Sequence, residues 1–252
     1  TLSYIAYYST DTQARIISPT DLVVYDEKGQ AFLAALDEKQ IPYEMHAFDI
    51  KELSFNFADL VAADITGTPF ATQEPSVPVL KLSEVQQMYP EYELAHNEAI
   101  IMNYVSFFAE FLPIEAGITA SFSSENQTYE FNIKDVEKKM IVGSALSGGG
   151  SPILVVADEV FKELPMQQNI GFNKQYLVEL DEAHVEAATA LYDEMGMKKI
   201  VFNLYTDADG SVVETTYNQK TYEQARTNTI LSMGTVIFTT AFLGLAFLLA
   251  TG

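Results

Sequence analysis

Cysteine and tryptophan are absent from the 252 residues, and basic residues are scarce. The lack of cysteine excludes disulfides, thiolate metal sites and cysteine nucleophiles. Only 14 Lys and Arg stand against 35 Asp and Glu, which gives a formal net charge of −21. A surface of this kind repels phosphate backbones, so nucleic-acid binding is excluded as a function class. It attracts cations such as metals, polyamines or basic peptides; the alternative is that the acidity only keeps the protein soluble.

Motifs that would carry catalysis or hold a metal are also lacking. His46, His96 and His184 are far apart and show no metal-ligand spacing. Asp207-Ala-Asp-Gly210 lacks the earlier oxygen ligand and the closing Glu of a calcium loop, so we expect a turn there. The Gly148–Gly150 run lacks the Lys that follows in a phosphate loop. We therefore predict no catalytic residue, no metal site and no cofactor, and do not expect an enzyme.

One uncharged segment is long enough to cross a membrane. It runs from Thr227 to Gly252, and as a helix its central 21 or so mostly apolar residues would span a bilayer core of about 30 Å. We therefore expect a transmembrane helix over 229–250. Its small residues are of the type that let membrane helices pack closely, which favours a helix in a bundle; they include Gly234, Ala241 and Gly244.

The remaining sequence alternates between strand-like and helix-like patterns, which predicts an α+β (mixed α/β) domain with two lobes. A first strand–helix–strand unit runs from Leu22, with Asp26 as the expected helix cap, and a second runs from 175 to 205, with Asp181 in the same role. Between the two units we predict strands over 77–82, 129–133 and 153–157 and a helix over 98–112. Residues 153–157 are wholly apolar, which is typical of a central strand covered on both faces.

The glycine-rich stretch 147–151 is the most flexible by composition and is the predicted hinge. It divides the soluble part into a distal α/β region over 1–146 and a membrane-proximal β-α-β region over 152–226. Because the chain has neither an initiator Met nor a signal peptide at Thr1, we expect it to be an excerpt of a longer protein.

The predicted helix over 98–112 would carry a cluster of aromatic residues on one face. Core packing is one interpretation of this face. The other is an exposed groove for an amphipathic or lipidic ligand. The aromatic candidates for such contacts are Tyr104, Phe107, Phe108 and Phe111.

The last third of the chain resembles a known family in its layout. The strand Tyr176-Leu-Val-Glu-Leu180, the helix after Asp181, the turn at 205–210 and the run Ala225-Arg-Thr-Asn-Thr-Ile-Leu lead directly into the Gly- and Thr-rich segment. This layout resembles the end of the large extracellular domain of FtsX-like permeases, in particular the BceB type of bacitracin and lantibiotic resistance transporters. In that family such a domain lies between the seventh and eighth membrane helices, so the resemblance implies this domain plus helix eight.

The resemblance also implies a function and partners. The domain would lie outside the bacterial cell membrane and recognise a cationic antimicrobial peptide or its complex with a cell-wall lipid. A separate ATPase subunit and a membrane histidine kinase would be partners. We expect the acidic residues Asp181, Glu182 and Glu186 to attract the peptide. Two alternatives stay open: another FtsX- or MacB-like permease with a lipoprotein, peptide or cell-division role, and a surface binding protein with a C-terminal anchor.

Overall fold

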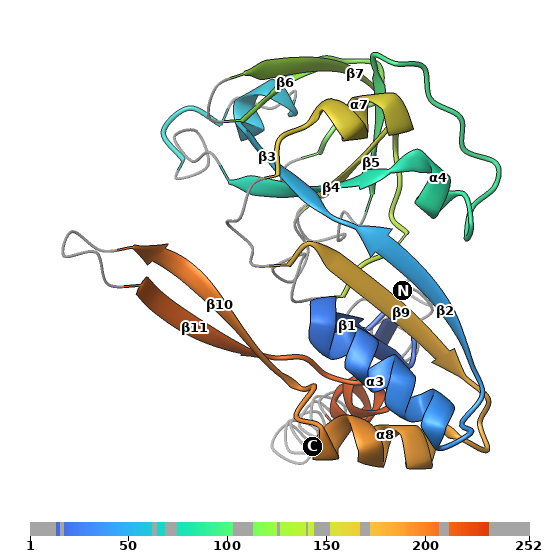
Figure 1. Ribbon diagram of the computed structural model, residues 1–252. Coiled ribbons are helices and arrows are strands. Elements are labelled where there is room, and N and C mark those ends of the chain that lie inside the picture. The colour runs from blue at the N-terminus through green and yellow to red at the C-terminus, as the bar shows by residue number, and fades with distance from the viewer. Residues whose placement is uncertain are drawn as a thin grey trace, which may run out of the picture.

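The computed structural model describes residues 14–15, 18–61, 65–68, 75–102, 113–124, 127–139, 141–143, 152–166, 172–206 and 212–231. Their architecture mixes helices and strands, which confirms that part of the predicted fold class. Figure 1 shows an upper lobe formed by a barrel and a lower lobe formed by a small sheet with helices. A two-stranded ribbon of β10 (Lys199–Thr206) and β11 (Val212–Asn218) extends to the side.

The upper lobe is a closed barrel with the strand order β3-β4-β8-β5-β7-β6. The pairs β4–β8 and β5–β7 are parallel, and the other neighbouring strands are antiparallel. Short helices lie between strands in the described ranges: η1 (Phe57–Asp59), α4 (Leu82–Val85) and α7 (Asp158–Glu163). The strands are β3 (Lys51–Phe55), β4 (Ser76–Lys81), β5 (Glu98–Met102), β6 (Thr119–Ser123), β7 (Thr128–Val136) and β8 (Ile153–Val156).

The helix predicted to start at residue 98 is wrong for residues 98–102, which form strand β5. Ala99 and Ile101 belong to the core inside the barrel, whereas Ile100 and Met102 belong to a second apolar cluster outside it. Because both faces of this strand are covered, its apolar residues do not alternate with polar ones, and the sequence imitates a buried helix. Strand β8 is covered on both faces in the same way, which confirms that prediction.

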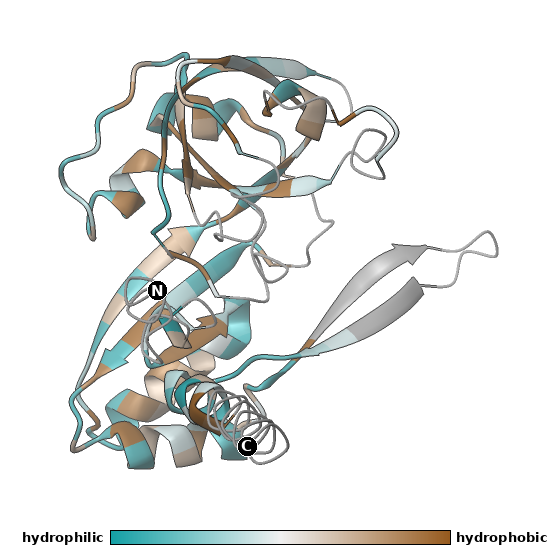
Figure 2. Cartoon of the chain, turned by 180° about the vertical axis from the view of Figure 1, so that it is seen from behind, coloured by the Kyte–Doolittle hydropathy of each residue, from teal (hydrophilic) through white to brown (hydrophobic). Residues whose placement is uncertain are grey.

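The lower lobe is an antiparallel sheet in the order β1-β9-β2, with α3 and α8 packed against it. Its elements are β1 (Leu22–Tyr25), α3 (Asp26–Glu38), β2 (Tyr43–Asp49), β9 (Lys174–Leu180) and α8 (Val185–Glu194). Phe32 of α3 and Tyr192 of α8 meet edge to face, with ring centroids 5.6 Å apart. Figure 2 shows that hydrophobic and hydrophilic residues are interspersed along these helices and strands.

Neither predicted helix cap is formed by the residue expected. The Asp26 carboxylate accepts hydrogen bonds from the backbone N–H groups of Asn173 and Lys174, at the start of β9. Helix α8 begins at Val185 and has no side-chain cap, because 181–184 form a tight turn in which the His184 N–H donates to the Asp181 carbonyl at 2.8 Å. The two aspartates therefore take part in contacts outside the first turn of each helix.

The two lobes share an apolar cluster, so they meet through a packed interface. Phe48 and Leu177 of the lower sheet and Ile153 and Val155 of the barrel belong to it. Only Ile50 separates β2 from β3, so one stretch of chain crosses from lobe to lobe. An apolar interface of this kind disfavours relative motion of the lobes.

The sheets group the strands differently from their order along the chain. Strand β8 lies in the barrel, and β1 and β2 pair with β9. The boundary predicted at 147–151 lies outside the described residues and stays a prediction.

A further helix is described over 222–231 at the base of the lower lobe. Thr221 and Gln224 form a reciprocal capping box at its start: each backbone N–H donates to the other's side chain, at 3.4 and 3.3 Å. Within the described ranges no helix is both long and apolar enough to cross a membrane. Of the span predicted over 229–250 only 229–231 are described, and Gly234, Ala241 and Gly244 lie beyond them.

Candidate functional site

A cavity with a volume of about 670 Å³ lies in the lower lobe. One wall is formed by α8 and the turn that precedes it, and the other by the first turn of helix 222–231. The floor is the end of β9. The lining residues are Arg15, Asp21, Glu179, Leu180, Glu182, Val185, Glu186, Thr189, Thr221, Tyr222, Glu223 and Gln224. We call this cavity the acidic pocket, because five of these residues are Asp or Glu and one, Arg15, is basic.

Most of the carboxylates in the acidic pocket have no partner among the residues that the structure describes. The Asp21 side chain accepts a hydrogen bond from the Leu180 N–H at 2.8 Å. The others are exposed and form no ion pair or hydrogen bond with any residue in the described part of the chain; they are Glu179, Glu182, Glu186 and Glu223. The pocket therefore combines unneutralised negative charge with apolar wall groups from Leu180 and Val185. This chemistry suits a ligand that is both cationic and amphipathic.

The α8 wall is fixed to the core of the lower lobe. Ala188, Leu191 and Tyr192 are buried, and the Tyr192 hydroxyl donates to the Val23 carbonyl of β1 at 3.0 Å. Burial of Leu191 alone stabilises this arrangement by about 2 kcal/mol. Glu182 and Glu186 are consequently held at defined positions on one side of the pocket.

The opposite wall is held by contacts of the first helical turn. The Tyr222 N–H donates to the Asp21 carbonyl at 3.0 Å, and the Arg15 guanidinium lies 3.9 Å from the centre of the Tyr222 ring. Arg15 also donates to the Pro19 carbonyl at 3.0 Å. The single cation of the pocket is thus engaged in holding the helix and neutralises the carboxylates only in part.

Asp181 lines a neighbouring hollow of about 480 Å³, with Tyr43, Glu44 and Glu179. Glu44 of β2 lies directly opposite Glu179 of β9 in the strand register. Like charges in this position destabilise a sheet, and a nearby cation would relieve the repulsion. The negative charge of the acidic pocket therefore continues around the end of β9.

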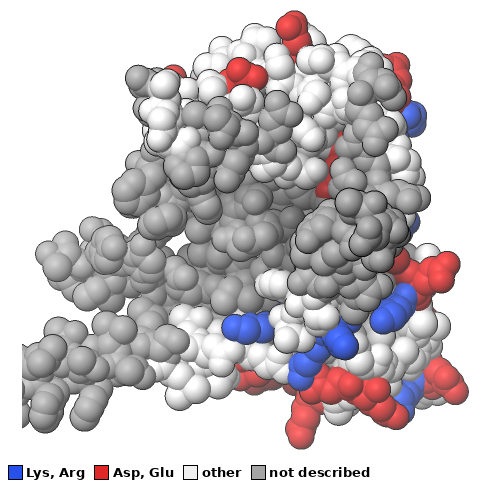
Figure 3. All heavy atoms as spheres, turned by 90° about the vertical axis from the view of Figure 1, so that its left-hand side faces the viewer, with Lys and Arg blue, Asp and Glu red and all other residues white. Residues whose placement is uncertain are grey.

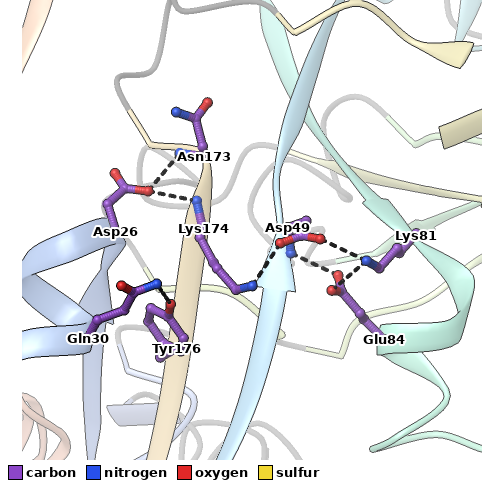
Figure 4. A network of polar contacts seen from close by, with 8 residues as sticks. All are labelled: Asp26, Gln30, Asp49, Lys81, Glu84, Asn173, Lys174 and Tyr176. Carbon is purple, nitrogen blue, oxygen red and sulfur yellow. Dashed lines mark hydrogen bonds and ion pairs between the residues drawn. The ribbon is translucent and has the colours of Figure 1, made fainter. Parts of the chain in front are cut away.

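A different polar cluster lies where the lobes meet (Figure 4). The Asp49 carboxylate contacts Lys81 at 2.8 Å and Lys174 at 3.1 Å. Glu84 contacts Lys81 at 2.9 Å and accepts the Asp49 N–H at 2.8 Å. Burial raises the pKa of Asp49, but hydrogen bonds from both lysines outweigh it and hold the pKa below its usual value. Burial raises the pKa of Glu84. Because these charges compensate one another, we assign the cluster a structural role and not a role in ligand binding.

A second hollow, of about 520 Å³, carries mixed charge. Its lining includes Lys28, Lys174 and Lys199 together with Asp26 and Glu27. Figure 3 shows one face of the molecule, on which Lys and Arg side chains lie above a row of Asp and Glu side chains at the base of the lower lobe. Three basic residues thus stand beside two acidic ones in this hollow, in contrast to the acidic pocket.

The structure brings together part of the predicted site. Glu182 and Glu186 line the acidic pocket, and Asp181 lines the hollow beside it. The aromatic candidates lie outside the described residues and are not placed: Tyr104, Phe107, Phe108 and Phe111. Within the described ranges, no group of three or more His, Asp and Glu side chains could hold a metal ion.

Sequence reasoning missed the other residues of the acidic pocket, above all Asp21, Glu179 and Glu223. They come from three distant parts of the chain, and only the antiparallel pairing of β1 with β9 brings the first two together. The local signal in the sequence is the charged residue Glu179 near the end of β9, after four consecutive buried residues.

Comparison with known proteins gives two related sequences. The Bacitracin export permease protein BceB of Halalkalibacterium halodurans is 24% identical over 252 residues, and that of Bacillus subtilis is 23% identical over 261 residues. The chain is related to BceB-type permeases. Both alignments cover the whole chain, and the chain spans 37% and 36% of the length of these relatives. No protein-family model matches the chain.

The BceB-type relationship confirms the resemblance noted over 175–252. It also extends beyond that stretch, because both alignments include the barrel and the first strands of the lower lobe. The stretch that the BceB-type relatives share with the chain therefore includes both the upper and the lower lobe.

Proposed function

We propose that the chain is the extracellular substrate-recognition and sensing domain of an ABC transporter permease that confers resistance to cationic peptide antibiotics of the bacitracin and lantibiotic type. The acidic pocket is the observation that carries the proposal, because its unpaired carboxylates and apolar walls suit an amphipathic cation. The names of the two relatives, both bacitracin export permeases, support the choice of ligand class.

The proposal includes the setting of the domain. Residues 229–250 form a transmembrane helix in the bacterial cell membrane, and Gly234, Ala241 and Gly244 let neighbouring helices approach it. The permease works with a separate ATPase subunit, which hydrolyses ATP, and with a membrane histidine kinase. The ligand is the peptide itself or its complex with a cell-wall lipid.

The two predicted glutamates of the pocket give a quantitative test. Replacing both Glu182 and Glu186 by Gln removes two charges that each contribute about 0.5–1 kcal/mol to the binding of a cation at a surface site. The dissociation constant should therefore rise roughly 5- to 30-fold at low salt. It should rise less at 1 M salt, because the screening length falls from about 10 Å at 0.1 M to about 3 Å.

The measurement is a calorimetric titration of the chain in lipid nanodiscs with nisin and with zinc-loaded bacitracin. The matched control is Glu159→Gln with Glu163→Gln, which removes the same charge from two exposed positions of α7 in the barrel. We expect the control to bind as the unchanged chain does. Equal weakening in both double variants would mean that net charge alone attracts the peptides, and the pocket would lose its assigned role.

A further inference from the structure

The two walls of the acidic pocket differ in how they are packed. The α8 wall is fixed to the core, whereas helix 222–231 is mostly exposed beyond its first turn. The α8 wall has three residues in the core of the lower lobe, Ala188, Leu191 and Tyr192. On the other wall Thr221 and Ala225 are buried, whereas residues 226–228 and 230–231 are exposed. Ile230 and Leu231 expose 43% and 64% of their surface. Helix 222–231 is thus anchored at its start, and that anchor is itself the pocket wall.

The anchor lies in the first turn of the helix. It includes the Tyr222 N–H bond to the Asp21 carbonyl, the contact of Arg15 with the Tyr222 ring, and the burial of Thr221 and Ala225. The capping box of Thr221 and Gln224 lies within the helix and does not tie it to the lobe. A small change in the pocket therefore acts at the base of a helix whose further turns are exposed.

The charges of the two walls have the same sign. Glu182 and Glu186 lie on the α8 side, and Glu223 lies on the helix 222–231 side. With the pocket empty, these carboxylates repel one another across it. A cationic ligand that contacts both walls removes this repulsion and favours the arrangement in which the walls are closer. A ligand shifts such an equilibrium only as far as its affinity differs between the two arrangements, and a ligand that bridges both walls meets that condition.

We infer that occupation of the acidic pocket sets the orientation of helix 222–231 relative to α8, so that the pocket regulates the helix that leads toward the predicted membrane span. This inference rests on the proposed function for the ligand class. It adds the moving part, which is the first turn of the helix, and the residue that couples ligand to helix, which is Glu223.

The absence of cysteine makes a direct distance measurement possible. Spin labels are attached to Ala190→Cys on α8 and Asn228→Cys on helix 222–231, both exposed and outside the pocket lining. Electron–electron resonance is recorded on the full chain in lipid nanodiscs, with and without saturating nisin. We expect the mean distance to change by about 2 Å or more, the size of helix shifts in known switches.

Two controls separate coupling from binding. A label pair at Ala34→Cys on α3 and Ala190→Cys reports the rigid lower lobe and should not respond. In the 190/228 pair, Glu223→Gln should weaken nisin binding and should abolish most of the distance change even at a nisin concentration that saturates this variant, as its own titration determines. Glu194→Gln, at the exposed far end of α8, should leave both binding and the distance change as they are in the unchanged chain.

The outcomes are distinguishable. If nisin binds with the expected dependence on Glu182 and Glu186 but the 190/228 distance stays the same, the inference is overturned and the proposed function stands. If nisin does not bind, the proposed function itself fails. A distance change that survives Glu223→Gln unaltered also overturns the inference, because Glu223 would then not couple the two walls.

Discussion

Asp26 links the start of α3 to the start of β9, and its replacement gives a stability prediction that can be worked out from geometry. Its carboxylate accepts the N–H of Asn173 at 3.0 Å and the N–H of Lys174 at 2.8 Å. The backbone of Asp26 has φ = 47°, in the left-handed region that Asp and Asn tolerate better than other residues with a β-carbon. Figure 4 shows the side chain bridging the helix and the strand.

Asp26→Ala should lower the free energy of unfolding by about 2–3 kcal/mol. Each bond to a charged acceptor contributes roughly 1.5–3 kcal/mol when buried, and here water replaces part of it because one of the two is exposed. The left-handed backbone adds about 1 kcal/mol for alanine. Burial raises the pKa of Asp26, so the charge itself is not favoured. Asp26→Asn keeps the acceptor oxygen and should therefore stay within about 0.5 kcal/mol of the unchanged chain.

Urea unfolding followed by circular dichroism measures these differences. Asp26→Gly relieves the backbone but loses both bonds, so its loss should fall between those of Asn and Ala. Hydrogen exchange should also accelerate at the amides of Asn173 and Lys174 in the Ala and Gly variants only. Equal unfolding midpoints for Ala and Asn would refute the reasoning, because the acceptor oxygen would then contribute nothing.

Three further predictions concern the interface of the lobes. Gly143→Ala should lower the free energy of unfolding by about 1–3 kcal/mol, because the added carbon would lie 2.6 Å from the buried Tyr25 hydroxyl; an unchanged melting temperature would contradict this. Tyr25→Phe removes a buried hydroxyl that has no partner among the described residues, so stability should stay equal or rise by about 1 kcal/mol, and the double variant should recover part of the Gly143→Ala loss. Asp49→Asn should destabilise the chain at pH 7, and the loss should shrink progressively as pH falls below 3.8. The lysine contacts hold the Asp49 pKa in the folded chain below its value in the unfolded chain. The stabilisation by the charged Asp49 is therefore complete above the unfolded pKa and is lost as pH falls through the folded pKa. A difference that stays constant from pH 7 to pH 3 would refute the assignment of Asp49.

Local sequence patterns predicted elements that have a helical period or that are short apolar runs, including strands β1 and β8, which are buried throughout. Strand β1, helix α3 and strand β9 follow their patterns, and Gly196 ends the α8 region with φ = 67°, as a helix stop requires. The failure at β5 has a physical cause, since Ala99 to Met102 are buried on both faces and carry no period. The barrel itself was not predicted, because its closure depends on pairing between distant strands such as β3 and β6.

Of the residues that line the acidic pocket, only two that are close together in the sequence were candidates for peptide binding. Glu182 and Glu186 belong to a single acidic stretch, so their role could be proposed from local sequence. Their partners Asp21 and Glu223 are close in space only because β1 pairs with β9 and because helix 222–231 begins beside Asp21. Strand order and helix docking are properties of the whole chain, which a single sequence does not display.

The most direct test of the central claim is to locate the peptide on the chain. A benzophenone is attached to Thr189→Cys, inside the acidic pocket, or to Glu163→Cys on the barrel, and each chain is illuminated with nisin at low salt. We expect the label at 189 to cross-link to the peptide and excess unlabelled bacitracin with zinc to suppress the product. Cross-linking of equal yield from 163, or from 163 alone, would contradict the claim that the acidic pocket is the binding site.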